Sequence, residues 1–327
     1  MNVVYNRLWS TDIKRVSVIT PVYNRRLELP RALMSLEQQT CLDIEHIVIN
    51  DGSIQLIDDI MEDYMDRVNY PVAYIKKDNG GVHTARNAGI KVSRGKYMAF
   101  LDSDDEFLPH FIETFLTAWD SIPEEIRGEY RECNAFCVDQ YGRRIGEHLP
   151  QDINKLPYDR ANYIARKGKR GEKVGFYNAS LMRDNPWPEP KGVKVVSENI
   201  LWAQLEYKYK TWFLDNELRV YYTESYDGLT NANSKLKEQT LINALYNSLW
   251  FVNNGRRYGL SRRALLFNSI KFMTFKWLLK RLYKYPSYDW AEQGVFLPLD
   301  RILHAFLLLP TFFLSLVYQY KYRTRSK

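Results

Sequence analysis

The sequence predicts an α/β fold, with a mostly parallel sheet flanked by helices. Two observations carry this prediction. Short apolar runs alternate with amphipathic segments through the first hundred residues, and turn-forming or acidic residues follow each apolar run. With 327 residues, the chain is long enough to bury a core in one large domain or two modest ones.

Four apolar runs in this region have the length and composition of strands that are buried on both faces. They are Val16–Thr20, His46–Ile49, Val72–Ile75 and Tyr97–Leu101. Amphipathic helices are predicted between them, from apolar residues three or four positions apart, over 29–36, 56–64 and 85–92. Strands that alternate with helices at this spacing pair in parallel, because a parallel connection needs a crossover segment.

Beyond residue 110 the alternation is less regular. We predict strands at 133–138, 193–196 and 219–222, a helix over 200–209 and helical structure from 241 to 285. The segment 166–171 is basic and contains two glycines, which predicts a loop. Three cysteines are too few for a disulfide framework and favour a reducing compartment.

Polar or acidic residues follow all four strands predicted in the first hundred residues. In an open parallel sheet, ligands bind beyond the carboxyl ends of the strands. The most acidic of these turns is LDSDDEF at 101–107, where three carboxylates fall within four residues. Such carboxylates repel one another unless a cation lies among them, and an Asp-x-Asp at a strand end can hold a divalent metal on a diphosphate. A solvated acidic turn is the alternative.

Two further residues near these strand ends are candidates for ligand contacts. Asp51 follows the second strand, where a carboxylate can accept hydrogen bonds from a nucleobase imide or a ribose hydroxyl, although Asn-Asp-Gly also favours a turn by itself. Arg86 lies in a short helix after a Gly pair, where a guanidinium can pair with phosphate. The alternative for Arg86 is a surface arginine on a helix.

Four segments in register resemble a known family: VSVITPVYNR, HIVINDGS, NGGVHTARNAGI and GKYMAFLDSDDEF. In this order and spacing they look like inverting family 2 glycosyltransferases of the Rossmann-like GT-A fold, of the type that builds bacterial surface polysaccharides. The resemblance is strong over 14–110 and thins out toward residue 230. It implies a catalytic domain over 1–233, with a nucleotide-sugar half at 14–110 and an acceptor half at 111–233.

The resemblance also assigns roles to individual residues. It implies that a nucleotide sugar, mostly a uridine diphosphate (UDP) sugar in this family, contacts Thr20, Pro21, Tyr23, Asp51, Arg86 and Asp102. Asp102 and Asp104 match the Asp-x-Asp of the family, which holds Mn²⁺ or Mg²⁺. The second aspartate is usually the metal ligand, and the first lies near the ribose or the sugar of the donor.

Inversion needs a general base that takes the proton of the acceptor hydroxyl. In the family this base is an acidic residue at the start of a helix downstream of the sheet, and the matching stretch here is VVSENILWAQL. We expect Glu198 to be the base; its alternative is a first-turn Glu that complements the helix dipole. Asp105 and Asp215 are weaker candidates. Asn199 lies where the family commonly has a second acidic residue. A protein that binds nucleotide sugars without catalysing transfer is therefore an alternative function.

The function implied by the resemblance is transfer of a sugar, with inversion, from a nucleoside diphosphate donor to a saccharide acceptor. A lipid-linked intermediate of a polysaccharide is the expected acceptor. Transfer directly onto a polyprenyl phosphate is a second enzymatic alternative. Against it, related enzymes of that kind usually lack so long a segment between the metal motif and the base.

The charge of the chain is distributed unevenly. The formal net charge is +7, but residues 234–327 carry +12 and the first 233 carry −5. In this C-terminal region, cations are interleaved with Leu, Phe and Trp at helical spacing, which is typical of helices that lie on an anionic membrane. Nucleic acid is not the expected partner, because its grooves do not require such long aliphatic stretches.

Residues 302–319 run without a formal charge, and Pro310 lies in their middle. This length is close to the minimum for crossing a bilayer, so the segment spans the membrane, enters it partway or packs against the protein. The first residues lack the apolar run of a signal peptide. We therefore expect a cytoplasmic enzyme that is peripheral or monotopic at the inner face of the cell membrane.

Overall fold

The computed structural model describes residues 1–9, 13–148, 171–223 and 238–283. Contacts divide the chain into two compact units. The first unit comprises Met1–Pro186 with Lys208–Ser225, and the second comprises Trp187–Tyr207 with Tyr226–Lys327. The segment that contains Glu198 therefore groups with the C-terminal helices.

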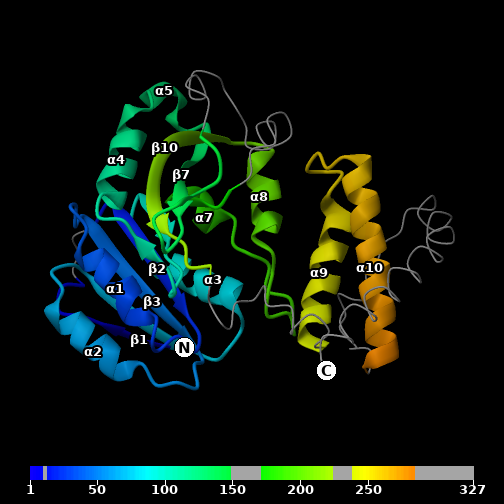
Figure 1. Cartoon of the computed structure of the whole chain (residues 1–327), viewed down its shortest axis with the longest axis horizontal. Helices are drawn as coiled ribbons and strands as arrows, with labels where there is room; N and C mark the ends of the chain where they lie inside the picture. Colours follow the sequence, from blue (N-terminus) through cyan, green and yellow to red (C-terminus); the bar gives the residue numbers. More distant parts are fainter. Residues whose placement is uncertain (10–12, 149–170, 224–237, 284–327) are drawn as a thin grey trace. The chain divides into compact units, whose positions relative to one another are not determined.

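Strands of the first unit form one mixed sheet, ten-stranded over the described residues (Figure 1). They are β1 (Asn2–Tyr5), β2 (Val16–Val22), β3 (Ile44–Asp51), β4 (Val72–Lys77), β5 (Tyr97–Phe100), β6 (Glu106–Phe107), β7 (Tyr130–Val138), β8 (Arg144–Ile145), β9 (Lys173–Asn178) and β10 (Lys210–Val220). Their order is β1-β4-β3-β2-β5-β9-β7-β10-β6, with β8 beside β7. β4, β3, β2 and β5 are parallel, as are β7 and β10, which confirms the predicted α/β fold.

The strand order reverses between β2 and β5. From β2 the chain moves outward through β3 to β4, and it then returns to place β5 on the other side of β2. At such a reversal, the loops that follow the two strands leave in opposite directions, and ligands bind beyond the carboxyl ends. The fold therefore puts the residues after β2 and β5 where ligands bind in sheets of this kind.

Helices cover both faces of the parallel strands. They are α1 (Leu29–Glu37), α2 (Asp58–Arg67), α3 (Val82–Val92), α4 (Phe111–Ser121), α5 (Glu124–Arg127) and α7 (Ala179–Asp184). Helix α3 packs closely on β2 at Gly89, because a Cβ atom there would lie 2.6 Å from Cγ2 of Ile19. The side chains of Val16 and Val18 lie on the other face of β2 from that of Ile19. There they form a core with buried residues of α1, α2 and α4.

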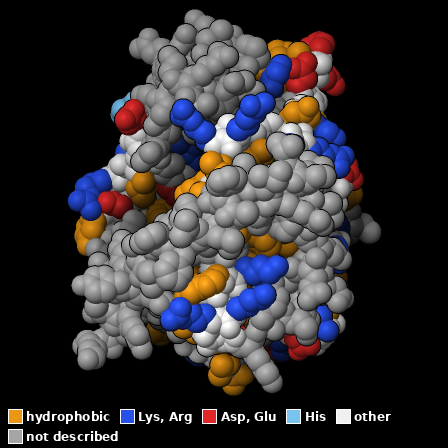
Figure 2. Space-filling view, turned by 90° about the vertical axis from the view of Figure 1, so that its right-hand side faces the viewer, with side chains coloured by type: hydrophobic (Ala, Val, Ile, Leu, Met, Phe, Trp, Pro, Cys, Tyr) orange, Lys and Arg blue, Asp and Glu red, His pale blue; other side chains and the backbone are white. Residues whose placement is uncertain are grey.

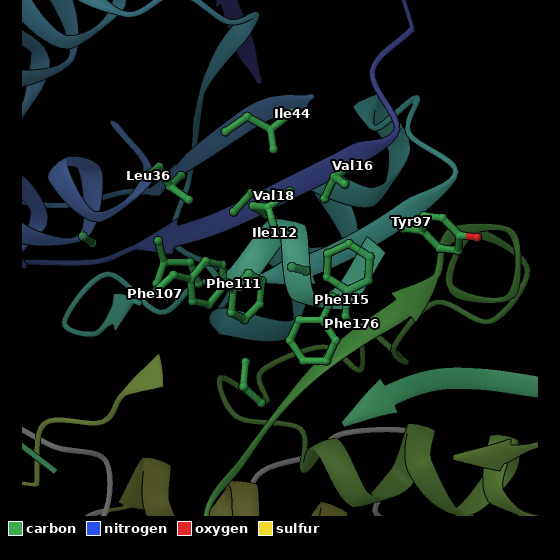
Figure 3. Packing of buried hydrophobic residues seen from close by; sticks show 14 of the residues in the cluster. Val16, Val18, Leu36, Ile44, Tyr97, Phe107, Phe111, Ile112, Phe115 and Phe176 are labelled. Carbon is green, nitrogen blue, oxygen red and sulfur yellow. The ribbon is translucent and has the colours of Figure 1, made fainter. Parts of the chain in front are cut away.

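Stacked aromatic rings fill part of this core (Figure 3). Phe107 stacks on Phe111 with ring centroids 3.5 Å apart, and Phe111 contacts Phe115 at 4.9 Å. Phe115 stacks in turn on Phe176 of β9 at 5.0 Å. The acidic turn 101–107 thus ends in a buried ring, which anchors the turn to the core and limits how far its carboxylates can move.

The described part of the second unit contains α8 (Glu198–Glu206), α9 (Glu238–Asn254) and α10 (Arg262–Leu282). Helices α9 and α10 lie side by side (Figure 1), which confirms the predicted helical C-terminal region over these residues. Within the described ranges, no helix combines the length and the apolar composition needed to cross a bilayer. The uncharged segment 302–319 and most of the predicted basic loop lie outside those ranges.

The strand predicted at 193–196 is wrong. The side chains of Asn243 and Asn247, both on α9, hydrogen-bond the backbone of residues 194–197 at 2.8–3.1 Å. Val193 and Val196 are each 2% exposed. Asparagine amides therefore satisfy the backbone groups that a neighbouring strand would otherwise bind, and the apolar pattern reflects burial of single valines.

Helix α10 presents basic and apolar side chains together. The ammonium of Lys271 lies 4.4 Å from the ring centroid of Phe267, and the guanidinium of Arg281 lies 4.9 Å from that of Trp277. Phe267 is 57% exposed, and burial lowers the pKa of Lys271. Figure 2 shows Lys and Arg side chains next to hydrophobic ones on the face turned toward the viewer.

Candidate active site

Two arginines bind the carboxylate of Asp102, just past the end of β5. Arg86 of α3 donates to Oδ1 at 2.9 Å, and Arg219 of β10 donates to Oδ2 at 2.8 Å. Both arginine side chains are 8% exposed, whereas Asp102 is 33% exposed. Burial raises the pKa of Asp102, but the charges and hydrogen bonds of the two guanidiniums outweigh it, so the net pKa lies below the ordinary value. Asp102 is thus an ionised carboxylate in a fixed orientation.

Arg219 also binds Asp105, and the sequence analysis did not identify this arginine. Its Nε donates to Oδ2 of Asp105 at 2.8 Å, and its Nη2 contacts the same oxygen. The antiparallel pairing of β10 with β6 places Arg219 opposite Phe107, although 117 residues separate it from Asp102. The available signal is a single arginine in LRVYY, an otherwise apolar stretch.

Asp105 is more deeply buried than Asp102, with a side chain that is 3% exposed. Its Oδ1 accepts a hydrogen bond from the backbone N–H of Tyr222 at 3.0 Å, while Oδ2 is bound by Arg219. Burial, opposed by Arg219 and reinforced by the charge of Asp102, raises the pKa of Asp105 to about 6. Because both oxygens bind groups of the protein, Asp105 holds the acidic turn in place.

Asp104 lies closer to solvent than Asp105. Its side chain is 28% exposed, and its Oδ2 lies 3.5 Å from Nε of Arg25. Its backbone carbonyl accepts a hydrogen bond from Arg31, whose guanidinium lies 3.5 Å from the ring centroid of Tyr222. The cation expected among the three carboxylates is therefore supplied in part by arginines of the chain itself.

Asp104 is the carboxylate that fits a divalent cation best. Its ion pair with Arg25 is loose at 3.5 Å, whereas Asp102 binds arginines through both oxygens at 2.8–2.9 Å. Within the described residues, no group of three or more His, Cys, Asp or Glu side chains is suited to hold a metal. Mg²⁺ can bind through one or two protein carboxylates, with phosphate oxygens and water as its other ligands. The side chains present fit a metal that is shared with a diphosphate.

The loop that follows β4 binds the carboxylate of Asp51. The backbone N–H groups of Gly80 and Gly81 donate to it at 3.0 and 2.8 Å, and Lys77 Nζ donates at 2.6 Å. Gly81 has a φ of 98°, a conformation that favours glycine. Since α3 begins at the next residue, Asp51 fixes the start of the helix that carries Arg86.

The three residues predicted to contact the nucleotide after β2 lie in different environments. The hydroxyl of Thr20 is 2.9 Å from Nε2 of His46, which lies within a buried hydrogen-bonded chain that continues to Tyr64. Burial lowers the pKa of His46 to about 3, so the imidazole is neutral. Pro21 is buried within β2, and Tyr23 is 46% exposed just beyond it. Among these three, Tyr23 offers its side chain to a ligand most directly.

Glu198 is the first residue of α8, follows Ser197 at the N-cap, and is exposed. The two weaker candidates for the base are both engaged in ion pairs of the first unit. Asp105 binds Arg219, and Asp215 binds Arg144 and lies 3.0 Å from Nδ1 of His148. Both carboxylates are thus bound by protein groups, and the assignment of Glu198 as the base stays a prediction.

Known proteins match this chain over its sheet and its motifs. Residues 17–172 match the family described as Glycosyl transferase family 2. YibD of Escherichia coli, an uncharacterized glycosyltransferase, is 30% identical over 223 residues, which are 64% of this chain and 59% of YibD. The minor teichoic acid biosynthesis protein GgaB of Bacillus subtilis is 38% identical over 112 residues, 34% of this chain and 12% of GgaB. The chain spans less than two thirds of the length of each relative.

Solved structures share the fold. S. aureus TarS in complex with UDP-GlcNAc has a TM-score of 0.52 at 17% identity, covering 80% of this chain and 81% of that one. The mannosyltransferase PcManGT from Pyrobaculum calidifontis, in complex with GDP-Man and Mn²⁺, has a TM-score of 0.51 at 14% identity, covering 95% and 85%. The fold is the GT-A type that the motifs predict, and within it residues 17–172 match the glycosyl transferase family 2 domain.

Proposed function

We propose that the chain transfers a sugar, with inversion, from a UDP sugar to a saccharide acceptor. The observation that carries this proposal is the ionised Asp102 carboxylate, bound between Arg86 and Arg219 where the strand order reverses. The complexes of TarS and PcManGT, which share the fold, support a nucleoside diphosphate sugar as donor. The similarity to GgaB, a minor teichoic acid biosynthesis protein, supports a cell-surface polysaccharide as the product. The acceptor in this proposal is a lipid-linked intermediate of that product.

The donor binds along the edge formed by the ends of β2, β3 and β5. Tyr23 contacts the nucleobase, with Thr20 and Pro21 forming the strand end behind it. Asp51 shapes the β4–α3 loop at the nucleoside and positions Arg86, which pairs with the diphosphate. The partly exposed Asp102 accepts a hydrogen bond from a hydroxyl of the ribose or the transferred sugar.

Glu198 takes the proton of the acceptor hydroxyl while that oxygen attacks the anomeric carbon and the diphosphate leaves. Asp104, with Asp102 beside it, would hold Mn²⁺ or Mg²⁺, which would supply positive charge to the departing diphosphate. The exposure of Asp104 and its loose contact with Arg25 leave its carboxylate available for this role.

Asp104→Asn is expected to abolish the metal-dependent part of donor binding. An amide is a poorer ligand for a hard cation than a carboxylate, so the diphosphate loses its bridge to the protein. In a thermal-shift screen of UDP sugars with Mn²⁺, the unaltered chain should be stabilised by about 2.7 kcal/mol when the sugar is at 100 times its Kd, and by less without Mn²⁺. The variant should show the same small shift in both conditions.

Asp78→Asn provides a matched control, because Asp78 is an exposed aspartate in the β4–α3 loop at the same edge of the sheet. This variant should keep the full Mn²⁺-dependent shift. An equal Mn²⁺-dependent shift in Asp104→Asn would contradict the metal assignment. If no nucleotide sugar stabilised the unaltered chain in Mn²⁺, the donor proposal itself would fail.

We further infer that the C-terminal region binds an anionic membrane surface, which places the enzyme beside a lipid-linked acceptor. Its support is the net charge of +12 over residues 234–327 and the exposed cations of α10 next to exposed apolar side chains such as Phe267. A basic, partly apolar helix binds such surfaces through both charge and burial of apolar area.

Replacing Lys280 and Arg281 together by glutamine is expected to weaken membrane binding. Each cation near an anionic surface contributes about 1 kcal/mol, so two cations correspond to a roughly 30-fold change in partition. Sedimentation of the full chain with phosphatidylglycerol vesicles measures this change. The matched control, Lys14→Gln with Lys91→Gln in the first unit, should partition normally; equal losses in both variants would show that net charge alone decides binding.

A further inference from the structure

A cavity of about 350 Å³ lies at the end of β5 opposite to the acidic turn. Its lining includes Tyr97, the first residue of β5, together with residues of β9, α4, α5 and α7. About 17 Å of extended chain separates Tyr97 from Asp102. The volume falls within the roughly 300–1,000 Å³ of small-molecule sites. The cavity is thus separate from the candidate active site.

Three cations and no carboxylate line this cavity. The cations are Lys96, Arg127 and Arg183. Arg127 donates to the carbonyl of Ile122 at 2.8 Å and Arg183 to that of Gly95 at 2.7 Å, which holds both guanidiniums in place. Three like charges around one cavity repel one another, and an anion inside it removes this repulsion.

Three acidic residues adjoin this lining in the sequence, namely Asp120, Glu129 and Asp184; Glu129 binds Lys210, and Asp184 is exposed. Asp120, one residue beyond Trp119, binds Arg15 through both carboxylate oxygens at 2.8 and 3.0 Å. Lys96 is exposed, and its ammonium lies 5.4 Å from the centroid of the Tyr97 ring. The positive charge of the cavity is therefore available to a ligand.

The hydroxyl of Tyr97 is a second indication of a ligand. Tyr97 is 1% exposed, and its hydroxyl has no hydrogen-bond partner within the described part of the chain. Its ring stacks on Trp119 with centroids 4.9 Å apart, and in Figure 3 the hydroxyl points away from the phenylalanine core. A buried hydroxyl without a partner destabilises the fold, and an oxygen of a ligand would accept its proton.

We propose that this cavity is a second ligand site, which binds the phosphate group of a small molecule through Lys96, Arg127, Arg183 and the Tyr97 hydroxyl. A doubly charged phosphate matches three cations better than a single carboxylate does, and guanidiniums suit its several oxygens. The rings of Tyr97 and Trp119 form an apolar wall for the remainder of the molecule.

The test is a titration of the full chain with inorganic phosphate at constant ionic strength, in which the melting temperature is measured at each phosphate concentration. We expect a saturable rise for the unaltered chain. Lys96→Gln and Tyr97→Phe should each raise the phosphate concentration at half-effect about fivefold or more, as expected for the loss of one charged or hydrogen-bonding partner. Without phosphate, Tyr97→Phe should be at least as stable as the unaltered chain, because it removes only the unpaired hydroxyl.

Lys91→Gln, which removes an exposed lysine of α3 outside the cavity, is the matched control and should titrate like the unaltered chain. Repeating the comparison with glycerol phosphate and with phosphatidylglycerol vesicles separates a soluble phosphate ester from a lipid headgroup; a response that depends on Lys96 supports the site in either form. The proposal is overturned if Lys96→Gln and Tyr97→Phe respond to every probe as the unaltered chain does.

Discussion

Replacing Arg219 with methionine is expected to lower the free energy of unfolding by about 3–5 kcal/mol at pH 8. Arg219 is the cation shared by Asp102 and Asp105, and its side chain is 8% exposed. Its removal leaves Asp105, 3% exposed, as a buried carboxylate without a counter-charge. Methionine fills a similar volume, so urea unfolding of the variant measures mainly the loss of the charge.

Arg144→Met is the matched control for this experiment. Arg144 also binds two carboxylates, but its partners Asp215 and Glu217 are 43% and 36% exposed. Water can solvate them when the arginine is removed, so the expected loss is within about 1 kcal/mol. Similar losses for Arg144→Met and Arg219→Met would contradict the view that burial of Asp105 makes Arg219 indispensable.

The loss in the free energy of unfolding of Arg219→Met is also expected to depend on pH. The pKa of Asp105 is about 6 in the folded chain, against an ordinary value of 3.8. The folded state therefore binds more protons than the unfolded state between these values, and the contribution of this carboxyl to stability is lost as the pH rises through 6. Without Arg219 the pKa rises further, so the variant should be closest to the unaltered chain near pH 5, where Asp105 is protonated.

The parts of the site that follow from the sequence are those decided by local pattern. Asp51 and Asp102 each follow a short apolar strand, and parallel pairing of those strands brings their carboxyl ends to one edge. The Gly pair likewise predicts that a helix carrying Arg86 follows it, although α3 begins at Val82, three residues before the predicted start. Such inferences need only strand period, turn chemistry and the rule that parallel strands end together.

The parts that do not follow depend on pairing between distant segments. Arg219 reaches Asp102 because β10 pairs with both β7 and β6, and no local pattern specifies these neighbours. For the same reason the sequence predicts either a metal or solvent around the acidic turn and no arginines, although guanidiniums from three distant elements lie against it. At 193–196, the side chains of α9 took the place of a strand partner, which alternation of apolar residues cannot reveal.

Glu198→Gln is expected to reduce sugar transfer by about 10²–10⁴-fold while the donor still binds. Glutamine keeps the size and the hydrogen-bonding capacity of the side chain but cannot take the proton of the acceptor hydroxyl. Release of UDP from a UDP sugar measures transfer, with a lipid extract of the source membranes as acceptor and hydrolysis by water as background. Donor affinity comes from the Mn²⁺-dependent thermal shift.

Glu238→Gln separates a base from a residue that only complements a helix dipole. Glu238 is the first residue of α9, as Glu198 is of α8, and both are exposed. If Glu198 acted on the dipole alone, each variant would lose about 0.3–1 kcal/mol of stability and neither would lose transfer. A general base instead predicts similar stabilities for the two variants and a loss of turnover in Glu198→Gln alone.

Turnover of Glu198→Gln within about tenfold of the unaltered chain would eliminate Glu198 as the base, because general bases contribute at least about a hundredfold. One of the two weaker candidates, Asp105 or Asp215, would then have to act as the base. Its carboxylate would have to separate from the arginine that binds it.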